Sequence, residues 1–322
     1  MAPFRRTVLG AQLLIIASAF GIVFAQTAQA AWPGANGRIV FLKEDFATMA
    51  AQIYSMKSDG ADEVNLSAAG GTSVSDLQPS VSPNGKRIVF TRAEFTAQGP
   101  TGQLWTMNID GSHQIDISNN PLLASESGPS WTEDGSKVMF VKAAFGTFPA
   151  FGGPIWIRDA DGKGTPRQLT SGPSDANPAM SPDGDLIAFS RPVKGPRHLF
   201  LMKADGTGAL TDLGQGAKPD WSPDSKRLVY GQGGSGPIMV MKISDPSHPQ
   251  KLGGPGDEAP VWSPDGTRIA FIHFNPATHA YQIWLMSANG RNPHAITSDP
   301  TSSNQKPSWQ SVRSGEGGQA GR

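Results

Sequence analysis

Four carboxylates recur at one place in this sequence, each three residues before a proline that itself returns at regular intervals. They are Asp76, Glu126, Asp175 and Asp257. Arranged around an axis, such side chains form a ring whose oxygens suit a hard cation such as calcium, or a cationic group of a partner. The alternative is structural, because an aspartate beside a turn commonly accepts hydrogen bonds from the backbone of that turn. We favour the structural role and keep the four residues as a candidate metal site.

Basic side chains recur at a second fixed place, at the end of the strand pattern that follows each proline. They are Lys43, Arg92, Lys142, Arg191 and His273. We expect them to pair in part with the carboxylates, which gives a surface of mixed charge rather than a field of one sign. Arg92 and Arg191 are also candidates for contact with a partner.

Aromatic side chains gather in the loops beyond these basic residues. Phe145, Phe148 and Phe151 lie within seven residues that show no strand pattern. Loops on a rigid scaffold carry function, and exposed aromatics are frequent interface anchors. The alternative is that the rings fold over the edges of the units as a small core of their own. The candidate binding residues are Phe95, Phe145, Phe148, Phe151, Phe274 and Tyr281.

The elements that position these residues form a sixfold repeat. Its first proline returns 41 to 50 residues apart, as Pro79, Pro129, Pro178, Pro219, Pro260 and Pro307. A period in the forties filled with short strands and Gly/Pro/Asp turns is typical of a β-propeller blade. The sequence therefore predicts an all-β fold, a six-bladed β-propeller of four-stranded antiparallel blades. Seven of the eight tryptophans fall at repeated positions, which favours packing between blades.

The two ends of the repeat complement each other. The first unit, from Ala35, lacks its first strand, whereas the last segment, around Trp309, is a first strand with no unit after it. Closing the ring with the C-terminal strand in the N-terminal blade leaves no open sheet edge. Within each unit, Ser-Pro-Asp-Gly predicts a type I turn between the first two strands, as at Ser263–Gly266.

Each repeat unit contains four sequence elements in a fixed order, and together they resemble the WD40-like repeats of TolB-type six-bladed propellers. The resemblance rests on Pro260-Val261-Trp262-Ser263-Pro264-Asp265-Gly266, then Ile269-Ala270-Phe271, Ile283-Trp284-Leu285-Met286 and an outer strand ending in Thr297, and it covers residues 37–311. It implies a periplasmic, non-catalytic module that binds a protein of the envelope, such as a lipoprotein. On this interpretation we expect the chain to differ from TolB proper in lacking an α/β domain before the blades.

The N-terminus has the features of an export signal. Arg5 and Arg6 precede an uncharged apolar stretch, and Ala28-Gln29-Ala30 offers a small-x-small cleavage site before Ala31. An uncleaved anchor is the alternative. We predict a signal peptide at 1–30, the propeller at 31–312 and a disordered tail at 313–322. The protein is then periplasmic or secreted and does not span the membrane after cleavage.

Composition and missing motifs limit the function further. Twenty-seven basic and 27 acidic residues leave no general attraction to nucleic acid, and the absence of cysteine excludes disulfides and thiolate metal sites. No Gly-x-Ser-x-Gly, His-Glu-x-x-His or P-loop motif occurs. Two hypotheses remain: a monomeric protein-binding scaffold without a cofactor, which we favour, and a calcium-dependent propeller enzyme, lactonase- or lyase-like, that uses the four carboxylates.

Overall fold

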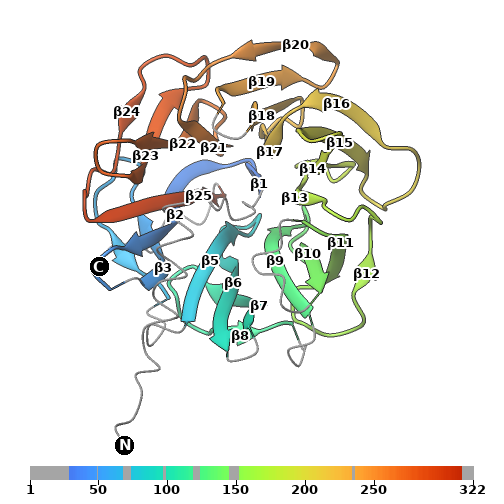
Figure 1. Cartoon of the computed structure of the whole chain (residues 1–322), viewed down its shortest axis with the longest axis horizontal. Coiled ribbons are helices and arrows are strands. Elements are labelled where there is room, and N and C mark those ends of the chain that lie inside the picture. Colours follow the sequence, from blue (N-terminus) through green and yellow to red (C-terminus); the bar gives the residue numbers. More distant parts are fainter. Residues whose placement is uncertain are drawn as a thin grey trace, which may run out of the picture.

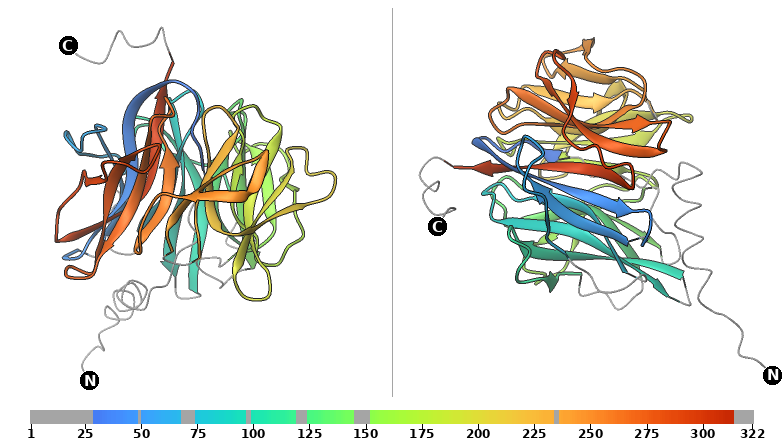
Figure 2. Two further views of the ribbon diagram at one scale, coloured as in Figure 1. Left: turned by 90° about the horizontal axis from the view of Figure 1, so that it is seen from above. Right: turned by 90° about the vertical axis from the view of Figure 1, so that its left-hand side faces the viewer.

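The computed structural model describes residues 29–48, 50–67, 74–96, 99–118, 124–144, 152–233 and 236–313. In these ranges, strands β1 to β25 form six sheets arranged around a central axis, and no helix is present (Figure 1). This confirms the predicted six-bladed propeller of four-stranded antiparallel blades. Viewed from the side, the twisted sheets stand next to one another and their strands cross the thickness of the molecule (Figure 2).

Four strands form each blade, from the innermost at the axis to the outermost at the rim. Blades 1 and 2 contain β25 (Ser302–Val312), β2 (Ala35–Asp45), β3 (Ala50–Met56) and β4 (Val64–Asn65), then β5 (Val74–Val81), β6 (Arg87–Thr96), β7 (Gly99–Asn108) and β8 (Ile115–Asp116). Blades 3 and 4 contain β9 (Ala124–Trp131), β10 (Lys137–Ala144), β11 (Ile155–Asp159) and β12 (Arg167–Gln168), then β13 (Ala176–Met180), β14 (Leu186–Pro192), β15 (Arg197–Lys203) and β16 (Thr211–Gln215). Blades 5 and 6 contain β17 (Ala217–Trp221), β18 (Arg227–Gly231), β19 (Ile238–Lys242) and β20 (Asp245–Lys251), then β21 (Asp257–Trp262), β22 (Arg268–Asn275), β23 (Ala280–Ser287) and β24 (His294–Ala295).

The predicted turns link the first two strands of the blades. At Ser263–Gly266 the amide of Gly266 donates to the carbonyl of Ser263 at 2.8 Å, and Gly266 has a φ of +69°. The hydroxyl of Ser263 also accepts from the amide of Arg268 at 2.9 Å, which fixes the start of the second strand. Ser225 replaces this glycine in the fifth blade and still adopts a φ of +57°. The turn geometry is therefore kept where the sequence copy is weaker.

The C-terminal strand closes the ring as predicted. β25 is the innermost strand of blade 1 and pairs antiparallel with β2, from Ala35 opposite Val312 to Asp45 opposite Ser302. Blade 1 is thus built from the two ends of the propeller, and every inner strand has a partner.

The repeated tryptophans lie between blades. Trp131, Trp221 and Trp262 are fully buried, and each belongs to an apolar cluster that joins neighbouring sheets. The indole of Trp131 donates to the carbonyl of Ser80 in the preceding blade at 2.9 Å. This confirms that the tryptophans pack between blades.

Each inner strand carries a bulge just before the repeat proline. The register between the first two strands shifts at this point in every blade. The residue before the proline has a positive φ in all six copies, and only one of them is glycine. The six are Gln78, Gly128, Asn177, Lys218, Ala259 and Lys306. A left-handed residue at a bulge bends the strand and re-aims its side chain towards a neighbouring blade.

A short N-terminal segment adds to the centre of the molecule. β1 (Gln29–Ala30) pairs parallel with β17 as a fifth strand of that sheet, next to the axis (Figure 1). Most of the predicted signal peptide, the tail from 314, and Phe145, Phe148 and Phe151 lie outside the described residues. Within the described ranges, no helix long and apolar enough to cross a membrane was found.

Candidate functional site

The predicted carboxylates lie where the inner strands begin, opposite the ends of the second strands. Three acid–base pairs are in direct register: Asp76 with Arg92, Glu126 with Lys142, and Asp257 with His273. The acidic and basic positions that recur separately in the sequence therefore meet within single blades. They share the face on which the second strand of each blade turns into the third.

Two of these pairs are bidentate. Arg92 donates from Nε and Nη2 to the two carboxylate oxygens of Asp76, at 2.7 and 2.8 Å. Arg191 does the same to Asp175, at 2.6 and 2.9 Å. Both aspartates are fully buried, whereas the arginine side chains remain 13% and 25% exposed. The planar guanidinium matches a carboxylate in this fork geometry, so each arginine is held rigidly at the surface.

Aromatic rings also lie close to the same two guanidinium groups. The Arg92 group lies 4.4 Å from the ring centroid of Trp105, and that of Arg191 lies 5.4 and 5.5 Å from Phe189 and Phe200. These are cation–π distances. The hydrogen bond to Asp175 raises the pKa of Arg191.

Glu126 takes part in a larger buried cluster. Its side chain accepts from Arg158 Nη2 at 3.0 Å and from Ser118 at 2.9 Å, and Lys142 lies 3.9 Å away. Burial raises the pKa of Glu126, although Arg158 and Lys142 oppose the shift. Arg158 lies in β11 and was not predicted, since no other blade carries an arginine at this repeat position.

Asp257 joins a histidine to its own loop. One oxygen lies 2.7 Å from Nδ1 of His273, and the other accepts from the amide of Gly254 at 2.7 Å. The His273 ring lies 5.0 Å from that of Trp284. Blade 6 thus uses an imidazole where blades 2 and 4 use a guanidinium.

These contacts determine which carboxylate oxygens are free to bind a cation at the predicted metal residues. In blades 2 and 4, both carboxylate oxygens already accept from one arginine, so a bound ion would have to displace it. Across the described ranges, no group of three histidine, aspartate or glutamate side chains lies close enough to hold a metal. The calcium site stays a prediction.

The predicted aromatic surface is only partly described. Phe95 lies in β6 opposite Pro100, and its side chain is outside the described part. Phe274 and Tyr281 face each other on β22 and β23, with ring centroids 5.2 Å apart. The hydroxyl of Tyr281 donates to Glu258 at 3.2 Å. These two half-buried rings therefore form one fixed pair.

Glu258 belongs to a buried cluster of charged side chains that was not predicted from the sequence. Lys218 Nζ lies 2.5 Å from Glu258 Oε2, and Gln305 donates to Glu44 at 3.1 Å. Burial raises the pKa of Glu44 to about 7 and lowers the pKa of Lys306, which interacts with both glutamates. A signal was present, because lysine stands immediately before the repeat proline in blades 5 and 1.

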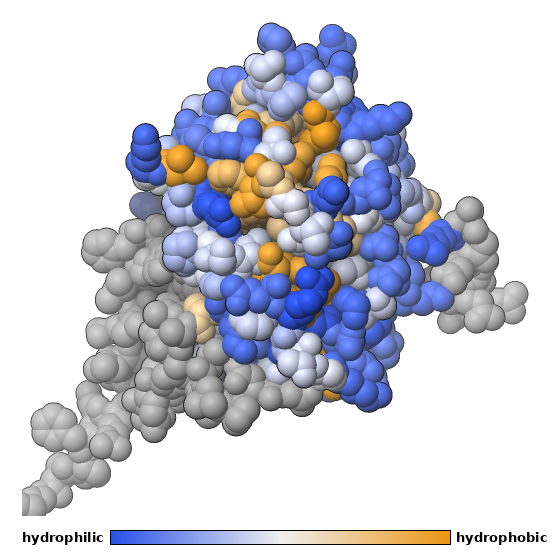
Figure 3. Space-filling model, turned by 90° about the vertical axis from the view of Figure 1, so that its right-hand side faces the viewer, coloured by the Kyte–Doolittle hydropathy of each residue, from blue (hydrophilic) through white to orange (hydrophobic). Residues whose placement is uncertain are grey.

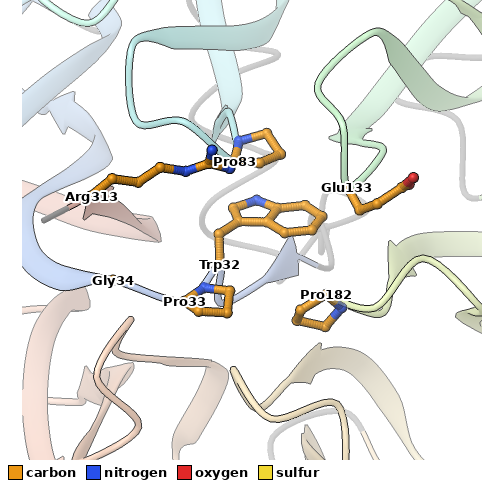
Figure 4. Close-up of a pocket in the computed structure, with 7 residues that line it drawn as sticks. All are labelled: Trp32, Pro33, Gly34, Pro83, Glu133, Pro182 and Arg313. Atoms are coloured by element: carbon orange, nitrogen blue, oxygen red, sulfur yellow. The ribbon is translucent and has the colours of Figure 1, made fainter.

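The opposite face has a hollow at the axis. Its volume is about 620 Å³, and it is lined by Trp32, Pro33, Gly34, Pro83, Glu133, Pro182 and Arg313 (Figure 4). Trp32 is the tryptophan outside the repeat, and it is buried against the inner strands. Three lining residues, Pro83, Glu133 and Pro182, occupy the same position in the turns of blades 2, 3 and 4.

The outer flank is a less distinctive surface. On the side of the molecule where blade 4 lies, hydrophobic residues form a broken band among hydrophilic ones (Figure 3). The exposed large apolar residues of the described ranges are scattered singly over the molecule: Phe46, Val64, Ile115 and Leu210. Single apolar residues on a surface are ordinary and do not mark an interface.

Comparison with known proteins agrees with this architecture. The family model described as the TolB beta propeller domain matches residues 36–313, which is most of the chain. The chain belongs to the TolB β-propeller family. The matched range begins in β2 and ends just after β25, and so includes the closed ring.

Curated relatives of this TolB-family chain are similar over shorter segments. The Tol-Pal system protein TolB of Anaeromyxobacter dehalogenans is 30% identical over 134 residues, 38% of this chain and 29% of that protein. An uncharacterized peptidase, YuxL of Bacillus subtilis, is 29% identical over 112 residues, 33% of this chain and 17% of the relative. The chain thus spans less than a third of these relatives' length.

Solved structures show the same fold at low sequence identity. TolB from Acinetobacter baumannii aligns with a TM-score of 0.68 at 18% identity, covering 96% of this chain and 74% of that one. A putative TolB from Agrobacterium tumefaciens aligns with a TM-score of 0.60 at 17% identity, covering 87% and 93%. At this identity the likeness concerns the fold alone.

Proposed function

We propose that this TolB-family propeller is exported and acts in the periplasm or cell envelope as a monomeric, non-catalytic scaffold that binds another protein. The partner is an envelope protein or lipoprotein. Some relatives are named as TolB of the Tol-Pal system, and this proposal extends their setting to the present chain.

The observation that carries the proposal is the rigid presentation of Arg92 and Arg191. Each is held in a bidentate pair by a buried aspartate and lies over an aromatic ring at a cation–π distance, yet remains partly exposed. Arginine is enriched at protein interfaces, and a side chain already fixed in one geometry loses little entropy on binding. The two arginines therefore suit contact with carboxylates or backbone carbonyls of a partner.

Affinity capture tests the proposal directly. The purified exported protein is immobilised, incubated with envelope extract, and compared with the double variant F148A/F151A and with R191A. Leu210→Ala, an exposed change on the outer flank, is the matched control. We expect one protein to be retained in stoichiometric amount by the wild type and the control, with and without chelator. F148A/F151A and R191A, the two variants on the face where the second strand of each blade turns into the third, should both lose at least about tenfold in affinity, as interface anchors do.

The same experiment can reject the scaffold. Retention that is unchanged in both loop-face variants would remove this face as the binding surface. Retention or turnover of a small substrate that requires calcium and disappears in D76N and D175N would instead support the lactonase- or lyase-like enzyme.

A further inference from the structure

One buried carboxylate has no counterpart in the other blades. The residue directly after the repeat proline is small or uncharged in five blades and acidic in one. In blade order from the second, these residues are Ser80, Ser130, Ala179, Asp220, Val261 and Ser308. Asp220 lies in β17, the inner strand of blade 5, and is only 1% exposed.

A hydroxyl suffices for the structural task at this position. Ser308 accepts a hydrogen bond at 2.9 Å from the amide of Val81 in the next blade. Asp220 makes the equivalent bond with Oδ2, which accepts from the amide of Trp262 at 2.6 Å. A serine in place of Asp220 would keep this link between blades. The second carboxylate oxygen and its charge therefore need another explanation.

That second oxygen has no partner. Within the described residues, Asp220 Oδ1 is buried and makes no hydrogen bond. Burial raises the pKa of Asp220 well above its ordinary value, although the hydrogen bond from the Trp262 amide opposes the shift. An unpaired buried carboxylate is costly, and such groups are rare in folded proteins. A cationic donor is the group that this place lacks.

The N-terminal segment reaches the same place. β1 runs along β17 with Gln29 opposite Asp220 and Ala30 opposite Trp221. The amide of Ala31 donates to the carbonyl of Trp221 at 3.1 Å. Ala31 is buried in the same apolar cluster as Trp262, the residue whose amide binds Asp220. The nitrogen of Ala31 therefore lies beside the strand that carries the unpaired carboxylate.

We propose that the Ala30–Ala31 bond is the processing site of this protein and that the new α-ammonium group of Ala31 becomes the ion-pair partner of Asp220. The inference rests on the predicted export signal. Hydrolysis of the bond consumes one water molecule and leaves a carboxylate on Ala30 and an ammonium group on Ala31. The ammonium can donate to both Trp221 and Asp220, whereas the amide has a single hydrogen.

The fold also sets the order of events. Ala30 and Ala31 are 9% and 4% exposed, so a peptidase cannot reach their bond in the closed propeller. Cleavage then precedes closure of the ring, and folding buries the new ammonium group against β17. Processing in this way removes a destabilising feature of the uncleaved chain.

The first measurement is the N-terminal residue of the protein recovered after export of the full chain. We expect Ala31. A protein that begins at another residue overturns the proposal.

The second measurement is a double-mutant cycle between the N-terminus and Asp220. Urea unfolding is compared for processed and unprocessed full-length protein, each with and without Asp220→Asn. In the processed protein, we expect the substitution to raise the unfolding equilibrium constant about tenfold to hundredfold. In the unprocessed protein, the effect should be within about threefold. Equal effects in both forms overturn the proposal.

A second variant covers the case in which Asp220→Asn does not fold. Asp220→Ser restores the residue found in three other blades and keeps the bond to Trp262. It should show the same dependence on processing. A crystal structure of the processed protein gives a direct readout, with the Ala31 nitrogen expected within about 3.2 Å of Asp220 Oδ1. A longer separation contradicts the ion pair.

Discussion

The closure of the ring makes a prediction about Trp309. This residue lies in β25, is 5% exposed, and belongs to the same apolar cluster as Ile39, Phe41 and Met56 of the first blade. The substitution Trp309→Ala removes most of a buried indole from the only blade built from both ends of the propeller. Burying a tryptophan side chain and filling its cavity are together worth about 3–5 kcal/mol. We therefore expect the free energy of unfolding to fall by about that amount.

Urea denaturation measures the loss. With a slope of about 3 kcal/mol per M for a chain of this size, the midpoint should fall by about 1–1.7 M. Trp262→Ala is the matched control, because Trp262 holds the same repeat position in a blade whose four strands are consecutive. Its midpoint should fall by a similar amount.

The two variants should differ in where the molecule opens. β25 is linked to β2 by hydrogen bonds and packing alone, whereas β21 is followed directly by β22. In Trp309→Ala, hydrogen exchange should accelerate first in β2 and β25, and in Trp262→Ala it should not single out that pair. A midpoint shift below about 0.3 M, or uniform exchange in Trp309→Ala, would refute the reasoning.

Three further predictions follow from the charged residues. Because burial raises the pKa of Glu44 from 4.5 to about 7, the folded state holds this proton more tightly than the unfolded chain, and stability should fall as pH rises through that range. In Glu44→Gln, the urea midpoint should therefore change less between pH 5 and 7 than in the wild type. A midpoint that falls more steeply with pH in the variant would contradict this. Asp175→Asn removes the buried negative charge and one of the two oxygens that accept from Arg191, and it should cost about 3 kcal/mol in urea unfolding. The control Asp62→Asn changes an exposed aspartate and should leave the midpoint unchanged. If both substitutions lowered the midpoint equally, burial of the aspartate would not explain the loss in Asp175→Asn. Since Arg92 occupies both oxygens of Asp76, we expect the melting temperature to be the same with calcium and with chelator. A calcium-dependent rise that D76N abolishes would restore the metal site.

The pairing of acidic and basic side chains could be predicted from the sequence repeat only in part. Asp76 and Arg92 recur at fixed places in the repeat, and two strands joined by a tight turn must bring such places together. The partial pairing was predictable for that reason. The bidentate geometry was not, because it depends on the rotamer of Arg92 between Asp76 and Trp105.

Contacts outside the repeat could not be predicted. Arg158 reaches Glu126 from a position that is not basic in other blades, and Tyr281 turns to Glu258 instead of standing free in its loop. Both depend on the spacing between strands in space, which no local pattern encodes. The repeat pattern predicts only the features that the blades share, whereas each of these contacts occurs at one place in the ring.

The sequence by itself determined the number of blades, the strands and turns of each, and the closure of the ring, because all of these follow from local patterns repeated six times. The tertiary structure alone decided which groups meet at the axis. β1 beside Asp220, Trp32 in its hollow, and Lys218 against Glu258 are contacts between parts of the chain that only the closed ring brings together. Their free energy comes from burial in that ring, and burial is a property of the assembled fold.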